Sequence, residues 1–201
     1  YGEERRAGCR SGERIQMKNK KGYWIVLLTI AALLLDLVGR VLADQFVLPL
    51  WCDSIGTFLI AYLGGPVCGA VVGFSNNIIY GIFVDRQTVY CIVGALLGIA
   101  VGYFSKKNVF DREFTTMTLG MGLAVFSTIV AVLINTLLYN GMSGNVWGNQ
   151  VMMMCMDKGV PRYVSYVIGQ FCVEFLDKLV SVEIVYLLLK GVRCMRRGSK
   201  K

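Results

Sequence analysis

Residues 46–84 read FVLPLWCDSIGTFLIAYLGGPVCGAVVGFSNNIIYGIFV and contain two apolar segments, 46–63 and 66–84, that are separated by only two glycines. Each segment is close to the ~20 apolar residues that a helix needs to cross a bilayer. The Gly64-Gly65-Pro66 sequence ends one helix and starts the next, because glycine is favoured just after a helix and proline at its first position. The stretch therefore predicts a tight antiparallel hairpin of two transmembrane helices.

Four further apolar segments flank this hairpin, at 23–42, 88–105, 115–139 and 163–190. The 201 residues are 55% hydrophobic and 17% charged, with a mean hydropathy of +0.57, whereas soluble domains are about a quarter charged. The sequence therefore predicts an all-α membrane protein in the cell membrane. Its domain would be a bundle of six transmembrane helices over residues 23–190, which leaves no room for a sizeable soluble catalytic domain.

The sequence lacks the residues and motifs of several common chemistries. Histidine is absent, which excludes a histidine general base and a His-ligated metal. Neither a phosphate-binding GxxxxGK[ST] motif nor a GxSxG motif occurs. The seven cysteines show no CxxC spacing and are expected to be small buried side chains. We therefore expect no enzymatic activity, no cofactor and no metal site.

The positions of the basic residues predict the orientation. With six spans and both ends inside, sixteen Lys and Arg residues lie on the inner side and four on the outer side, which is a strong positive-inside bias. Residues 1–22 are then a disordered, basic cytoplasmic tail, and residues 191–201 are a second basic cytoplasmic tail. The net charge of +8 comes mainly from basic residues near the two chain ends, where the orientation in the membrane explains them. No nucleic-acid partner is therefore expected. Residues 17–44 also have the outline of a signal peptide, but the long apolar run without a clean cleavage site favours a retained helix.

Polar side chains inside the predicted spans are the candidate binding residues. Charged groups in hydrocarbon cost about 2.5–3.5 kcal/mol each, so each needs a partner or a function. With a rise of 1.5 Å per residue, polar groups from five helices fall at the midplane or in the outer half. Together with Asn76 and with Trp147 of the long 140–162 loop, the candidates are Asp53, Asn77, Tyr80, Tyr90, Asn135, Tyr139, Gln170 and Glu174. They predict an outward-opening pocket for a small polar molecule, although such groups also hold helices together in many bundles.

The last apolar segment contains Glu174, Asp177 and Lys178. Glu174 and Lys178 lie four residues apart with the acid first, which favours a structural ion pair on one helix face. Asp177 points about 100° away from that face and needs another partner.

Several motifs follow one another in a fixed order. The Asp53-Ser54-Ile55-Gly56-Thr57 stretch precedes a Gly65-Pro66 turn and a Gly69-Ala70-x-x-Gly73-x-x-x-Asn77 stretch, and the last segment contains Asp177-Lys178-x-x-Ser181-Val182. In these motifs the chain resembles the substrate-specific S components of energy-coupling factor (ECF) transporters, over roughly residues 20–192. The segment from Tyr90 to Gly102, followed by two lysines, is similar to the fourth helix of that family.

The resemblance implies a membrane subunit that captures a vitamin or related micronutrient from the outside. The implied partners are a transmembrane coupling protein and two ATPase subunits, so ATP would be hydrolysed by other chains. In the family the ligand lies in the outer half under loops that correspond here to 43–47, 84–87 and 140–162. Family members dock through small residues of the first helix, for which the nearest counterparts are Ala32, Gly39 and Ala43, although their spacing does not match the family motif cleanly.

Acidic, amide and tyrosine side chains suit a nitrogen heterocycle with hydroxyls or a positive charge, or a nucleoside-like ligand. A second hypothesis is a membrane sensor or scaffold that binds a small ligand or a partner helix without transport. A third is a small membrane enzyme that acts on lipid head groups. Such enzymes usually need Asp or His clusters at the cytoplasmic interface, whereas the acids of this chain lie within the spans or near the outer side.

Overall fold

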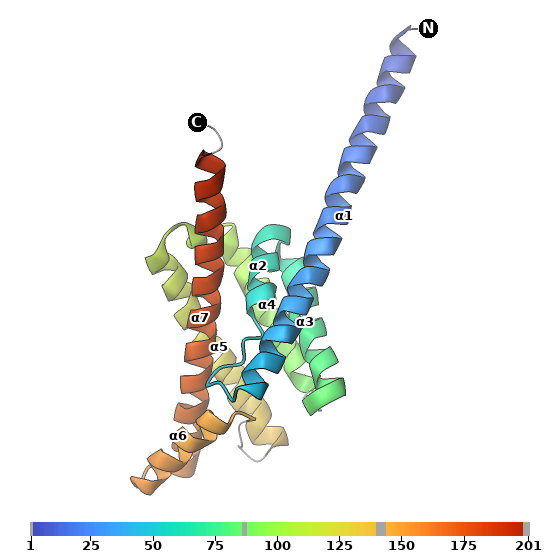
Figure 1. Ribbon diagram of the computed structural model, residues 1–201. Coiled ribbons are helices and arrows are strands. Elements are labelled where there is room, and N and C mark those ends of the chain that lie inside the picture. The colour runs from blue at the N-terminus through green and yellow to red at the C-terminus, as the bar shows by residue number, and fades with distance from the viewer. Residues whose placement is uncertain (1, 86–87, 140–143, 199–201) are drawn as a thin grey trace.

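The computed structural model describes residues 2–85, 88–139 and 144–198, and this part of the chain is helical and contains no strand (Figure 1). Seven α-helices follow one another as α1 (Gly2–Gln45), α2 (Ile55–Gly64), α3 (Pro66–Tyr80), α4 (Cys91–Ser105), α5 (Glu113–Leu138), α6 (Val146–Asp157) and α7 (Arg162–Gly198). Short turns of π-helix (Gly81–Asp85) and 3₁₀-helix (Thr88–Tyr90 and Val109–Asp111) lie between them. The all-α prediction is confirmed.

Several of these helices are long and apolar enough to span a membrane. Among the described residues, the four that qualify by length and composition are Gly22–Gln45, Pro66–Val84, Thr88–Ser105 and Glu113–Leu138. The predicted last span lies within α7, which is long enough but contains Glu174, Asp177, Lys178 and Glu183. A multi-pass membrane protein follows from these helices, and the count of six spans stays a prediction.

The predicted second span, 46–63, is not a continuous helix. Residues 46–54 form an irregular segment, and α2 contains only ten residues, which corresponds to about 15 Å, or half of the hydrocarbon thickness. Pro49 has no N–H to donate to a helix. The N–H groups of Trp51 and Cys52 donate to a side chain of α7 instead of to a preceding turn.

The helix α1 also differs from the prediction. It begins at Gly2 and so runs through the segment that was predicted to be a disordered tail. A formed helix grows at low cost, because each added residue gains one hydrogen bond without a new nucleation step. The apolar part of α1 begins at Gly22, close to the predicted start at residue 23.

The glycines at intervals of four in α3 and α4 pack these two helices against each other. A Cβ atom added at Gly73 would overlap the backbone of Gly94, and one at Gly98 would overlap the backbone of Gly69. The predicted hairpin between α2 and α3 is present, with Gly65 in the left-handed region (φ 88°) and Pro66 at the first helical position. The small residues therefore serve contacts within the chain.

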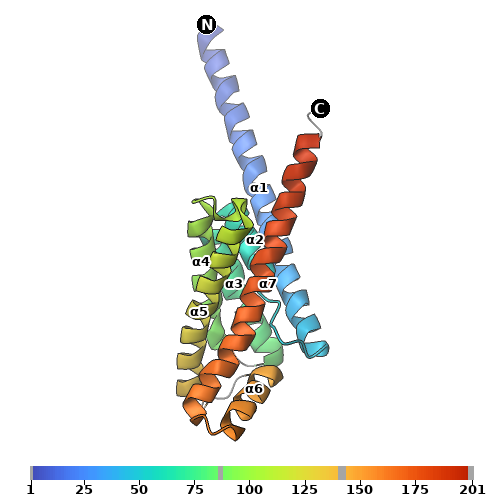
Figure 2. The same cartoon turned by 90° about the vertical axis from the view of Figure 1, so that its left-hand side faces the viewer.

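Both ends of the chain lie at the same end of the bundle, where α1 and α7 extend beyond the other helices (Figures 1 and 2). The helix α6 lies at the opposite end and packs on α7. The main core joins α2, α4, α5 and α7 through buried side chains that include Phe58, Val101, Leu123 and Val182. These helices enclose a polar site.

Candidate functional site

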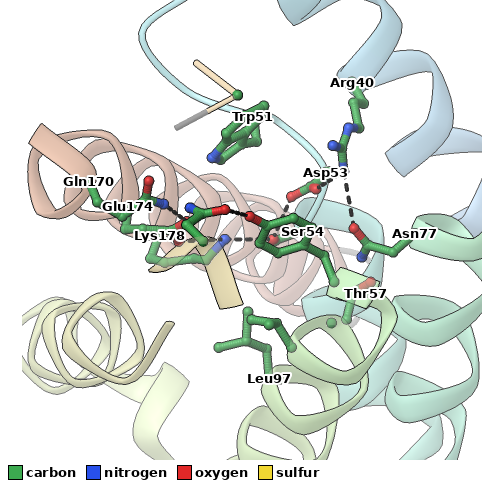
Figure 3. Close-up of a pocket in the computed structure, with 15 residues that line it drawn as sticks. Arg40, Trp51, Asp53, Ser54, Thr57, Asn77, Leu97, Gln170, Glu174 and Lys178 are labelled. Atoms are coloured by element: carbon green, nitrogen blue, oxygen red, sulfur yellow. Dashed lines mark hydrogen bonds and ion pairs between the residues drawn. The ribbon is translucent and has the colours of Figure 1, made fainter. Parts of the chain in front are cut away.

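A cavity with a volume of about 50 Å³ lies inside the bundle and has room for a few water molecules. Its lining comes from every α-helix except α6, from the 46–54 segment, from the 3₁₀ turn before α4 and from Gly144 of the long loop. The polar or aromatic lining side chains are those of Arg40, Trp51, Asp53, Ser54, Thr57, Asn77, Tyr90, Asn135, Gln170, Glu174 and Lys178. Figure 3 shows the residues of α7 on one side of the cavity and Arg40, Asp53 and Asn77 on the other. A cavity with so many convergent polar groups is unusual in an apolar bundle.

The N-terminus of α2 is held by a carboxylate from α1. Asp36, which is fully buried, accepts hydrogen bonds from the Gly56 N–H (2.6 Å), the Thr57 N–H (2.8 Å) and the Thr57 hydroxyl (2.7 Å). The first N–H groups of a helix lack partners within the helix, and Asp36 satisfies two of them, those of Gly56 and Thr57. This interaction fixes Thr57 at the cavity wall.

A second carboxylate holds the irregular segment from the opposite side. Asp177 of α7 accepts the N–H groups of Trp51 (3.0 Å) and Cys52 (2.8 Å) on one oxygen. Irregular backbone at membrane depth persists only where protein groups satisfy it. The two buried acids, Asp36 and Asp177, provide this satisfaction, and they thereby place Trp51, Asp53 and Ser54 around the cavity.

Arg40 of α1 forms one wall of the cavity and is 5% exposed. Its guanidinium donates to Asp53 Oδ2 (2.9 Å) and to Asn77 Oδ1 (3.0 Å). The same group lies over the rings of Trp51 (5.2 Å) and Tyr80 (4.2 Å). Bonds to a carboxylate and an amide together with two aromatic faces compensate for the burial of its charge.

Lys178 forms the opposite wall with the other residues of α7. Its ammonium lies 2.6 Å from Asp177 Oδ2, 3.1 Å from Ser54 Oγ and 3.5 Å from Glu174 Oε2. The ion pair predicted between Glu174 and Lys178 is therefore present, but Asp177 is the nearer partner. Gln170 donates from Nε2 to Glu174 Oε1 (3.1 Å), so three successive turns of α7 are linked by polar contacts.

Six of the ten predicted binding residues line this cavity: Asp53, Asn77, Tyr90, Asn135, Gln170 and Glu174. The Tyr90 hydroxyl donates to the Asn135 side chain, which connects the 3₁₀ turn before α4 to α5. Residues that were predicted to lie at a similar depth on different helices thus lie around one cavity, and their role in binding stays a prediction.

The other four predicted residues do not line it. Asn76 is buried and donates to the Asp53 carbonyl (3.3 Å), and the Tyr80 hydroxyl donates to Asp44. Trp147 in α6 is 44% exposed and donates from Nε1 to the Val47 carbonyl (2.6 Å), so it ties α6 to the irregular segment. Tyr139 lies directly after α5. Part of the long loop in which a lid was expected, residues 140–143, lies outside the described residues.

Five polar or aromatic lining residues were not among the predicted binding residues: Arg40, Trp51, Ser54, Thr57 and Lys178. A signal for Arg40 was present, since it lies with Asp36 inside the first apolar run, where a charge needs a partner. Lys178 was assigned only a structural role. Thr57 belongs to the Asp53–Thr57 motif of the sequence, but its position at the cavity depends on Asp36, twenty-one residues away.

The small residues predicted to dock a partner face the inside of the protein. Ala32 and Ala43 are 5% and 2% exposed. A Cβ atom at Gly56 would overlap the Ala32 carbonyl, and one at Gly39 would overlap the Cys52 carbonyl. The lack of side chains at Gly56 and Gly39 therefore allows α2 and the irregular segment to approach α1, and Ala32 and Ala43 are buried while Gly39 is partly buried.

No protein family model, curated protein or solved structure matches this chain. The residues of the cavity are therefore the basis for a functional proposal. Within residues 2–85, 88–139 and 144–198, no group of three or more Cys, Asp or Glu side chains is arranged to hold a metal ion. The cavity contains hydrogen-bond acceptors, buried charged groups and aromatic rings, which are the groups that bind small polar molecules in proteins.

Proposed function

We propose that this protein is the substrate-binding membrane subunit of an ECF-type importer. It captures a vitamin or related micronutrient, a nitrogen heterocycle or a nucleoside-like compound, on the extracellular side. A transmembrane coupling protein and two ATPase subunits then drive its release to the inside. The chain itself contributes binding and no bond chemistry.

The observation that supports this proposal most strongly is the polar cavity between α1–α5 and α7. Intramembrane ionisable groups are costly and usually mark a substrate or ion pathway. The half-length helix α2 begins at this cavity, and broken helices beside a buried site are a recurrent feature of transporters.

The position of the cavity fits capture from the outside. Arg40 lies five residues before the end of α1, Asn135 three residues before the end of α5, and Gln170 eight residues after the start of α7. All three helix ends lie away from the two chain ends (Figure 2). With the basic chain ends inside, as the positive-inside rule expects, the cavity is in the outer half of the bundle, as in the resembled family.

The cavity is small in this structure. About 50 Å³ is far below the roughly 300–1,000 Å³ of pockets that enclose drug-sized ligands. Ligand entry therefore requires the helix ends around Arg40 and Gln170 to separate. The bonds from Arg40 to Asp53 and Asn77 are the contacts between α1, the irregular segment and α3 that such an opening would change.

The proposal is tested with the protein purified in detergent and screened by thermal shift against vitamins and nucleosides. Stabilisation by one compound, with dose dependence and co-purification of ATPase subunits from native membranes, is the expected result. Stabilisation without any ATPase partner would favour the sensor hypothesis instead. No stabilisation by any compound and no partner subunits would contradict the proposal.

A further inference from the structure

Two adjacent acceptor atoms in the cavity wall receive no hydrogen bond from the described part of the chain: Gln170 Oε1 and Glu174 Oε2. Gln170 is 2% and Glu174 is 6% exposed, and both line the cavity. The two side chains are also joined by a hydrogen bond from Gln170 Nε2 to Glu174 Oε1. A buried acceptor without a donor costs about 1–3 kcal/mol. Hydrogen-bond donors of another molecule would remove this cost at both acceptors.

The cations nearest to this pair are occupied by other partners. Lys178 lies nearer to Asp177 (2.6 Å) and Ser54 (3.1 Å) than to Glu174 (3.5 Å). Arg40 donates to Asp53 and Asn77. The Ser127 hydroxyl of α5 is within reach of both the Glu174 carboxylate and the Ala124 carbonyl (3.2 Å), and it has one proton to donate. Of the three acids that pair with Arg40 and Lys178, Glu174 therefore has the longest ion pair.

The buried acids also exceed the buried bases. Arg40 and Lys178 form direct ion pairs with Asp53, Asp177 and Glu174, which are three acids for two bases. An anionic ligand would add to this excess, whereas a cation would remove it. A neutral ligand could satisfy the acceptors but would leave the charge of Glu174 incompletely paired.

We infer that the cavity binds an organic cation whose N–H groups donate to Gln170 Oε1 and Glu174 Oε2, as an amidinium or a protonated amino-heterocycle would. The inference rests on the proposed function, since it specifies the substrate class of the same site. Tyr90 also lines the cavity, and aromatic rings attract cations. The present volume suits the cationic group alone, and the rest of a ligand requires the cavity to widen.

The test uses three probes of the same shape and size: acetamidine, acetamide and acetate, which are cationic, neutral and anionic. Thermal stabilisation of the detergent-purified protein is measured for each probe at equal ionic strength. We expect acetamidine to give half-maximal stabilisation at a concentration at least tenfold lower than acetamide or acetate. An equal or stronger effect of acetamide or acetate would overturn the inference.

Two variants locate the effect. Glu174→Gln should weaken the acetamidine effect at least tenfold, and Gln170→Met should weaken it severalfold. Glu183→Gln is the matched control, because Glu183 is also on α7 and has an unpaired carboxylate oxygen but does not line the cavity; it should leave the effect within twofold. Equal losses in Glu174→Gln and Glu183→Gln, or no loss in Glu174→Gln, would refute the assignment.

The two proposals fail separately in these experiments. A micronutrient that binds tightly but is neutral or anionic would overturn the cation inference and leave the importer proposal standing. Binding of acetamidine that depends on Glu174, without binding of any micronutrient, would support the cation site and contradict the importer proposal.

Discussion

The carboxylate of Asp36 is the interaction whose removal is expected to affect the site and the fold together. It accepts three hydrogen bonds from the N-terminus of α2, at 2.6–2.8 Å, in a fully buried position. Asp36→Asn keeps the shape of the side chain but replaces one oxygen by an N–H₂ group, which cannot accept. At least one of the three donors then loses its partner.

The expected magnitude follows from these contacts. One buried donor without an acceptor costs about 1–3 kcal/mol. We therefore expect Asp36→Asn to lower the free energy of unfolding by about 1–3 kcal/mol, and Asp36→Ala, which removes both acceptor oxygens, to lower it further.

The assay is thermal unfolding of the purified protein in detergent, with Asp111→Asn as the control. Asp111 pairs with Arg193 at 2.8 Å but is about half exposed, so its loss should change stability by less than about 1 kcal/mol. Because Thr57 lines the cavity, Asp36→Asn should also weaken ligand binding. If both variants unfold at the wild-type temperature, Asp36 does not hold α2 in the way described.

Three further predictions address helix packing, the cavity, and the end of the bundle at which both chain termini lie. Gly94→Ala should destabilise the protein by about 1–3 kcal/mol, because the new Cβ would overlap the Gly73 carbonyl. The control Gly122→Ala, whose Cβ would have no atom within 4 Å, should be neutral, and equal unfolding temperatures of the two variants would argue against close α3–α4 packing. Asn77→Ala should weaken ligand binding without unfolding the protein, since it removes an acceptor of Arg40 (3.0 Å) from the cavity wall; unchanged affinity in titrations would assign Asn77 to packing. Arg193→Ala should cost no more than about 1 kcal/mol, because its contacts are partly exposed, and a loss of several kcal/mol in denaturation would contradict this.

Periodicity and composition were sufficient for the helical parts of the bundle. The Gly64-Gly65-Pro66 turn predicted a hairpin, and the apolar runs at 66–84, 88–105 and 115–139 predicted helices, all of which are present. These features depend on residues near one another in the sequence. The ion pair between Glu174 and Lys178 was predictable for the same reason.

The break in the second apolar segment could not be predicted in this way. Its backbone N–H groups bond to Asp177, which is 125 and 126 residues away from Cys52 and Trp51. An apolar run has the same pattern whether its N–H groups bond to the preceding turn or to a distant carboxylate. The depth of each polar residue in its predicted span was sufficient to place Asn77 and Glu174 at a common cavity. It could not predict the contact of Trp147, whose indole N–H donates to the backbone of the irregular segment.

The central claim, that this chain captures a small molecule in its polar cavity, is tested most directly by native mass spectrometry of the protein purified from its own membranes. We expect one bound small molecule per chain in the wild-type protein. The same molecule should be absent from Glu174→Ala and retained by the control Glu183→Gln. Wild-type protein that has no bound small molecule, and gains none when supplied with vitamins or nucleosides, would contradict the claim.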